Sequence, residues 1–208
     1  MTQRQVQPSL CLKTFALSVG RGETILAQDL SLSVPAGTGL LLRGPNGAGK
    51  STLLFTLAGL LPALSGTVTL EGYDEDFGPA FHHCGHKNAI RPRLTVIESL
   101  QFWQAINGSA ALTPVEALER VGLGRQAKSD AGYLSAGQQR RLALARLLVS
   151  ARPVWLLDEP TSALDADGQK LLAGLITEHL ASGGLAVIAS HDAIAVENLA
   201  VLDLGGRV

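Results

Sequence analysis

The pattern of hydrophobic and polar positions predicts strands in the first third of the chain. Leu30, Leu32 and Val34 alternate with polar neighbours and run into the turn sequence Pro35-Ala36-Gly37, which is typical of a strand with one buried face. The same part is predicted to hold a short apolar strand at residues 38–43, a helix at residues 50–61 and a further strand at residues 66–72.

Helical signals dominate the middle of the chain. Thr95 and Thr113 each stand three residues before a glutamate, which predicts a capping box, and Gly122 is a stop candidate for the second helix. After Ser135 the pattern predicts a helix through residue 149, a strand at 154–157, a helix ending near 183–184, a strand at 185–189 and a last helix. We therefore predict one α/β domain over residues 1–208, with a mixed core sheet, an N-terminal antiparallel β subdomain and a helical insertion at about residues 88–150.

Composition narrows the class of protein. Hydrophobic residues make up 46% of the chain and charged residues 17%, which is typical of a globular protein. The formal net charge is −1, so no general attraction to nucleic acid is expected. The longest apolar stretch, residues 53–64, is broken by Gly59 and Pro62 and is shorter than the ~20 residues that a bilayer span needs. Any membrane association is therefore expected to come through a partner.

The cysteines and the chain start indicate a compartment. Two cysteines, Cys11 and Cys84, are too few for a disulfide framework and fit a reducing compartment. Residues 1–10 are polar, with no apolar stretch of signal-peptide length.

A glycine-rich loop between a predicted strand and a predicted helix fits the phosphate-binding pattern G-x-x-x-x-G-K-[ST]. Its residues are Gly44, Pro45, Asn46, Gly47, Ala48, Gly49, Lys50 and Ser51, and Thr52 follows. The glycines let backbone N–H groups surround phosphate oxygens, and the helix adds its positive end. Lys50 can reach the terminal phosphates, and Ser51 can complete the ligand shell of a magnesium ion. The alternative, a flexible turn, does not explain the strand and helix on either side.

Two adjacent carboxylates follow a second apolar run, residues 154–157. Asp158 and Glu159 are predicted to lie at the carboxyl edge of a buried strand, where open α/β sheets bind ligands. Asp158 would hold magnesium, and Glu159 would orient or deprotonate the attacking water. The alternative is an ordinary acidic turn ended by Pro160. His191 follows the strand at 185–189 and is a candidate to sense the γ-phosphate and to fix Glu159.

A further segment opens a helix with Ser135, Ala136, Gly137 and Gln138, where Ser135 can act as the cap. The ordered series of the phosphate loop, this segment, the carboxylate pair, Asp165 and His191 resembles the ATP-binding cassette (ABC) ATPases over about residues 20–192. The resemblance implies a P-loop NTPase of the ABC-cassette type that uses ATP and Mg²⁺. It also implies a head-to-tail homodimer, in which Ser135 to Gln138 act on the nucleotide of the partner and Asp165 lies in the loop at the dimer interface.

Two positions depart from the pattern of that family. The aromatic residue that normally stacks on adenine is absent, and Arg21 is the candidate that lays its guanidinium plane on the base. The glutamine that normally links magnesium to the membrane partner is also absent near His86 and Lys87. Lys87 is the expected occupant of that place, and it cannot ligate magnesium as an amide oxygen would.

Among such cassettes, a transporter subunit fits best, because the chain holds one cassette and has no heptad run for a long coiled coil. Residues 84–103, residues 133–141 and the abrupt end after His191 resemble the ATP-binding subunits of the haem exporters of cytochrome c maturation. This resemblance implies an integral membrane subunit of the CcmB type, other haem-handling membrane proteins and a place on the cytoplasmic face of the inner membrane. ATP use would drive release of a haem-loaded chaperone. The alternatives are another small ABC transporter and a non-transport ABC switch.

The histidines and the cysteine at residues 82–86 invite a metal or haem site. On a strand, neighbouring side chains face opposite sides and do not converge. The sequence has no C-x-x-C-H haem attachment pattern, so we expect these residues to be structural and no direct haem binding.

Overall fold

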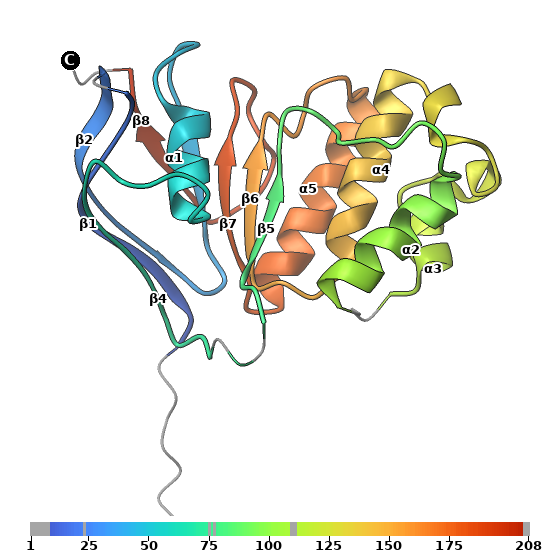
Figure 1. Cartoon of the computed structure of the whole chain (residues 1–208), viewed down its shortest axis with the longest axis horizontal. Coiled ribbons are helices and arrows are strands. Elements are labelled where there is room, and N and C mark those ends of the chain that lie inside the picture. The colour runs from blue at the N-terminus through green and yellow to red at the C-terminus, as the bar shows by residue number, and fades with distance from the viewer. Residues whose placement is uncertain (1–8, 23, 75, 77, 109–111, 206–208) are drawn as a thin grey trace, which may run out of the picture.

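The computed structural model describes residues 9–22, 24–74, 76, 78–108 and 112–205 (Figure 1). The predicted polar chain start lies mostly outside these residues. In chain order the elements are β1 (Cys11–Arg21), β2 (Thr24–Pro35), β3 (Gly39–Arg43), α1 (Lys50–Leu57), β4 (Ser65–Glu71), β5 (Phe81–Cys84), α2 (Val96–Asn107), α3 (Pro114–Arg120), η2 (Gly124–Gln126), η3 (Ala131–Tyr133), α4 (Ala136–Leu148), β6 (Val154–Asp158), α5 (Ala166–Ala181), β7 (Leu185–Ala189) and β8 (Leu199–Asp203). Within the ranges given above, no helix is both long and apolar enough to cross a membrane.

The strands form two sheets. Strands β2, β1 and β4 make an antiparallel sheet, and the other five strands have the order β5-β6-β7-β3-β8 with every neighbouring pair parallel. The predicted fold class, an α/β cassette with an N-terminal antiparallel β part, is confirmed. The mixture of strand directions predicted for the core sheet is instead divided between the two sheets. Tight hairpins suit antiparallel pairs, whereas parallel pairs need crossover connections such as helices.

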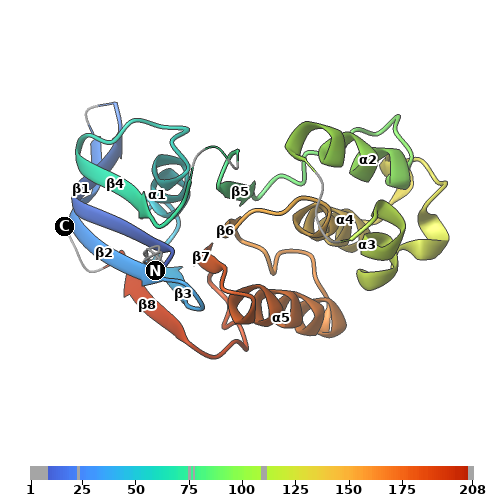
Figure 2. The ribbon, with the colours of Figure 1, turned by 90° about the horizontal axis from the view of Figure 1, so that it is seen from below.

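Three hydrophobic clusters hold these layers together. The first lies between the two sheets, where Leu53, Leu54 and Leu57 of α1 pack against both. The second lies on the other face of the parallel sheet, under α4 and α5. The third joins α2, α3 and α4, which stand on the side away from the antiparallel sheet in Figure 2. Helix α4 therefore belongs to both the second and the third cluster, and ties the helical part to the core sheet.

Glycine residues end three of the helices. The sequence predicts that the first helix runs to residue 61, but α1 ends at Leu57. Gly59 has a φ of 71°, its N–H donates to Thr56 O, and the Leu60 N–H donates to Phe55 O. This Schellman arrangement stops the helix at a residue that tolerates a left-handed backbone. Gly122 and Gly183 end α3 and α5 in the same way, as the sequence predicts.

The helix starts agree with the predicted capping boxes. The Oγ1 atoms of Thr95 and Thr113 each accept a bond from the backbone N–H of the glutamate three positions later. Both glutamates reach back to the N–H of their threonine, at 2.8 Å in each case. Both predictions are confirmed, because a capping box is formed by neighbours in the sequence and needs no tertiary contact.

The predicted last helix is wrong. Residues 191–198 contain no helix, and residues 199–203 form β8, which pairs with β3 from Leu199↔Gly39 to Asp203↔Arg43. The apolar run of β8 is too short for its periodicity to separate a strand from a helix. Pairing with a strand more than 150 positions earlier decides its conformation, and a local pattern does not carry that information.

Two buried histidines should make the folded state sensitive to acid. Burial lowers the pKa of His82 to about 3 and that of His179 to about 4. Because the pKa is lowered in the folded state, the unfolded chain takes up more protons below its own value of 6.5, and stability is lost as the pH falls from there. We expect the free energy of unfolding to drop by about 2 kcal/mol per histidine between about pH 7 and pH 5, measured by denaturant titration.

A matched pair of variants tests the cause of this pH dependence. His82→Gln should remove about half of the slope, because glutamine does not titrate and can still meet Ser150 Oγ, which lies 3.2 Å from His82 Nδ1. His86→Gln should leave the slope unchanged, because His86 is exposed. An equal slope in the wild type and in His82→Gln would contradict the assignment.

Candidate active site

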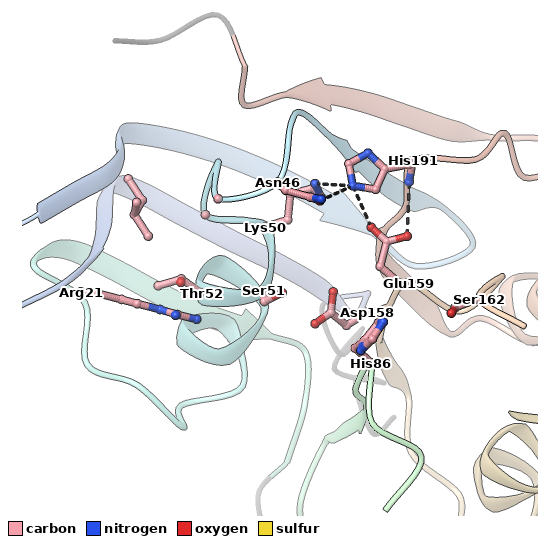
Figure 3. A pocket seen from close by; sticks show the side chains of 13 residues that line it. Arg21, Asn46, Lys50, Ser51, Thr52, His86, Asp158, Glu159, Ser162 and His191 are labelled. Carbon is pink, nitrogen blue, oxygen red and sulfur yellow. Dashed lines mark hydrogen bonds and ion pairs between the residues drawn. The ribbon is translucent and has the colours of Figure 1, made fainter. Parts of the chain in front are cut away.

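A cavity of about 580 Å³ opens at the carboxyl edge of the parallel sheet (Figure 3). The residues that line it come from three separate parts of the chain: Arg21, Leu26, Asn46, Gly47, Gly49, Lys50, Ser51, Thr52, His86, Asp158, Glu159, Ser162 and His191. The structure thus brings the phosphate loop, the carboxylate pair and the histidine together. Leu26 and Ser162 were not among the predicted site residues, and Gly44, Pro45 and Ala48 of the loop do not line the cavity.

The phosphate loop joins β3 to α1 and turns through glycines. Gly47 and Gly49 have φ values of 86° and 94°, which side chains rarely adopt. A Cβ on Gly49 would also lie 2.9 Å from Leu26 Cβ, so the loop packs too closely on β2 for any larger residue. Gly49 is the N-cap of α1 and gives no side-chain bond, which leaves the first N–H groups of the helix open toward the cavity. This arrangement fits the oxygens of a phosphate group.

Lys50 is the first residue of α1 and is only 7% exposed. Its Nζ donates to the carbonyl oxygens of Gly44 and Pro45, at 2.7 and 3.1 Å. The ammonium group is therefore held over the loop by the loop's own backbone. From there it can bond to phosphate oxygens with little further loss of side-chain freedom.

The two carboxylates stand at the end of β6, as predicted. Asp158 is the last residue of β6, is 5% exposed, and points into the space between Ser51 and His86 in Figure 3. Glu159 follows with a φ of 46°, an uncommon backbone conformation for a residue with a side chain. Its N–H donates to Ala189 O at 2.8 Å, which keeps β6 and β7 together up to this turn. The turn sends the side chains of Asp158 and Glu159 to different parts of the cavity.

His191 connects the end of β7 to both other parts of the site. Its Nε2 lies 2.8 Å from Asn46 Oδ1, 3.2 Å from Lys50 Nζ and 3.4 Å from Glu159 Oε1. The His191 N–H donates to Glu159 Oε2 at 3.4 Å. Figure 3 shows the imidazole between the phosphate loop and Glu159. The histidine is thus placed to hold the Glu159 carboxylate and to meet a group bound at the loop.

The two departures from the family pattern fall in different places. Arg21, at the end of β1, lines the cavity beside the phosphate loop, as the sequence predicts for a group that meets the base. In the loop after β5 it is His86 that lines the cavity, whereas Lys87, the expected occupant, does not. A chain that leaves a strand can present either of two successive side chains, so spacing alone did not decide between them.

Residues 135–138 lie at the start of α4 and do not line the cavity. Ser135 caps the helix: its Oγ accepts from Gln138 N–H at 3.3 Å, and Gln138 Oε1 accepts from Ser135 N–H at 2.9 Å. Asp165 caps α5 and accepts a bond from Arg141 at 3.1 Å, and these two contacts lower the pKa of the Asp165 carboxyl. One chain therefore carries the phosphate loop and residues 135–138 as two separate surfaces.

The residues at 82–86 face different ways. His82 lies next to Ser150, 3.2 Å away, and Cys84 is buried in the second cluster, whereas the ring of His83 meets Phe55 on the other face of β5 at a centroid distance of 4.9 Å. Across the described part of the chain, no three His, Cys, Asp or Glu side chains gather so as to hold a metal ion. The alternation of β5 accounts for the packing of these side chains.

Comparison with known proteins agrees with this geometry. The sequence profile of a family described as "ABC transporter" matches residues 27–162. The chain is 46% identical over 199 residues to the cytochrome c biogenesis ATP-binding export protein CcmA of Rhizobium meliloti, covering 92% of this chain and 96% of that protein. It is 47% identical over 192 residues to the CcmA protein of Chelativorans sp., covering 91% and 95%.

Solved structures give the same picture of the fold. An ABC transporter ATP-binding protein from Pyrococcus furiosus superposes with a TM-score of 0.81 and 25% sequence identity, covering 93% of this chain and 97% of that chain. A second structure, the ATP-binding subunit of an ABC transporter, has a TM-score of 0.78.

Proposed function

The chain belongs to the ABC transporter family of ATP-binding proteins, which are ATPases, and we propose that it powers an export complex in cytochrome c biogenesis. The observation that carries this proposal is the meeting of Lys50, Glu159 and His191 at one cavity. The CcmA relatives, matched over almost their whole length, favour this assignment over a generic transporter or a non-transport switch.

In the proposed reaction the phosphate loop and Lys50 bind the β- and γ-phosphates of ATP. Glu159 accepts a proton from the water that attacks the γ-phosphate, and the bond to the β-phosphate oxygen breaks to give ADP and phosphate. His191 keeps the Glu159 carboxylate aimed at that water and meets the γ-phosphate with its Nε2. Arg21 lies flat against the adenine base in place of an aromatic ring.

The residues present also fit a magnesium ion. Mg²⁺ is bound by one or two protein oxygens together with substrate phosphates, and Ser51 and Asp158 offer a hydroxyl and a carboxylate on the same side of the cavity. When bound, the ion neutralises negative charge on the phosphates. Thr52, 2% exposed, would support the loop from behind.

A complete site is proposed to need two chains. Residues 135–138 of one chain would close over the nucleotide held by the phosphate loop of the other, with Asp165 in the loop between them. Support comes from the separation of these surfaces in one chain and from the open side of the cavity. In this arrangement Ser135, Gly137 and Gln138 present a hydroxyl, an open backbone and an amide to the γ-phosphate. Ala136 stands where a second glycine is more usual.

We further propose a membrane partner for the loop at His86 and Lys87. That partner is an integral subunit of the CcmB type, which holds the cassettes on the cytoplasmic face of the inner membrane. Associated haem-handling proteins would then receive the work of ATP hydrolysis as release of a haem-loaded chaperone. The support is the resemblance of residues 84–103 and 133–141 to the haem exporters, together with the names of the relatives.

Co-purification from detergent-extracted membranes tests this assignment. We expect a tagged chain to bring down one integral membrane subunit, and the ATPase rate of the complex to differ from that of the chain alone. A chain that brings down ribosomes or DNA and no membrane subunit would refute the export assignment. Loss of the same subunit on exchanging the loop residues, tested with Lys87→Glu, would place the contact at this loop.

A further inference from the structure

Arg140 is the largest fully buried side chain of the molecule as described, with 1% of its surface exposed. It lies on α4, five positions after Ser135, and faces the sheet. A guanidinium group has five N–H donors, and five hydrogen bonds use them. Every acceptor is a carbonyl or amide oxygen, so the charge is held by oriented dipoles and no carboxylate pairs with it.

Three of these bonds go to successive carbonyl groups at the carboxylate pair. Nη2 donates to the oxygens of Asp158 and Glu159 at 2.9 and 2.7 Å, and Nε donates to Pro160 O at 3.1 Å. Glu159 is the residue with the left-handed backbone. Such a conformation persists only where surrounding contacts fix it, and here one planar group holds the carbonyls on both sides of it.

The other two bonds go to the loop after β5. Nη1 donates to Gly85 O at 2.8 Å and to Asn88 Oδ1 at 3.0 Å. These two residues stand on either side of His86 and Lys87. His86 lines the nucleotide cavity, and this loop is the one proposed to meet the membrane partner. A single rigid group therefore joins that loop to the backbone of the carboxylate that is proposed to take the proton.

We propose that Arg140 is a positioning residue that couples the position of the loop at residues 85–88 to the aim of the Glu159 carboxylate. This inference rests on the proposed function, because it gives the partner-facing loop a route to the reacting water. Lysine keeps the charge but offers its donors from one point, so it cannot reach both sets of acceptors. A displacement of about 1 Å in a reacting group can lower a rate by ~10²-fold.

Arg140→Lys in the complex with its membrane subunit tests the coupling. We expect kcat for ATP to fall by about tenfold or more while KM changes by less than about threefold. Hydrogen exchange at residues 85–88 should respond to ATP in the wild type and lose that response in the variant. Arg152→Lys is the matched control, because Arg152 is also buried and bonds to carbonyl oxygens, but at Asn107, away from the cavity. That control should keep both kcat and the exchange response.

A milder variant separates coupling from folding. Asn88→Ala removes one acceptor on the loop side and leaves the three carbonyl bonds in place. Its effect on kcat should be smaller, and it should not add to that of Arg140→Lys when the two are combined, because both break the same link. A wild-type kcat and exchange response in Arg140→Lys would overturn the inference while leaving the proposed function intact. Absence of ATP hydrolysis in the wild-type complex would overturn the proposed function itself.

Discussion

Replacing Glu159 with glutamine should stop ATP hydrolysis while leaving ATP binding intact, and the protein should accumulate as an ATP-bound dimer. Glutamine has nearly the same shape but cannot take a proton from water at neutral pH. Removal of a general base lowers a rate by about 10²–10⁴-fold. The phosphate loop, Lys50 and Ser51 are untouched, so the nucleotide still binds. Phosphate release measures the first effect, and light scattering with and without ATP measures the dimer.

A second glutamate provides the control for that experiment. Glu178 is an exposed residue of α5 that pairs with Arg120 away from the cavity, and Glu178→Gln should hydrolyse ATP at the wild-type rate. His191→Ala should act between the two variants, because it removes the group that holds Glu159 but keeps the carboxylate. Full turnover by Glu159→Gln would remove Glu159 from the role of base, and attention would pass to other groups at the cavity.

The parts of the site that could be predicted from sequence are those formed by neighbouring residues. The phosphate loop takes its shape from glycines within one short segment, and Asp158 and Glu159 lie at a strand end because an apolar run precedes them. The capping boxes at Thr95 and Thr113 follow the same logic. In each case the information lies within a few positions, so no knowledge of distant contacts is needed.

The parts that escaped prediction depend on distant contacts. Leu26 lines the cavity because β2 passes close behind Gly49, and β8 is a strand because β3 is there to pair with it. The role of Arg140 also depends on three segments meeting. A signal for it did exist in the sequence, since Arg140 lies three and four positions before the buried Ala143 and Leu144 and so shares their face of the helix. A charged residue on such a face needs acceptors, and that need could have been read.

The second large effect concerns Lys50. Lys50→Ala should weaken ATP binding by about a hundredfold or more, because two or more charge-assisted bonds to phosphate are lost at about 1.5–3 kcal/mol each. The loop should keep its glycine-determined shape, so circular dichroism and stability should change little. Lys170→Ala is the control, since Lys170 is an exposed lysine of α5 that pairs only with Asp167 on its own helix. Equilibrium binding of a fluorescent ATP analogue measures both variants.

Two inactive chains should restore activity to each other when they are mixed. In a head-to-tail dimer, Lys50 of one chain and Ser135 of the other belong to the same site. Lys50→Ala and Ser135→Arg should each lack ATPase activity alone. In a mixed dimer one site carries both substitutions and the other carries neither, so an equal mixture should recover about a quarter of the wild-type rate. Ser135 is exposed, so the arginine can be accommodated at a cost of about 1 kcal/mol for the lost cap. Full activity of Ser135→Arg by itself, with no gain on mixing, would mean that one chain completes its own site.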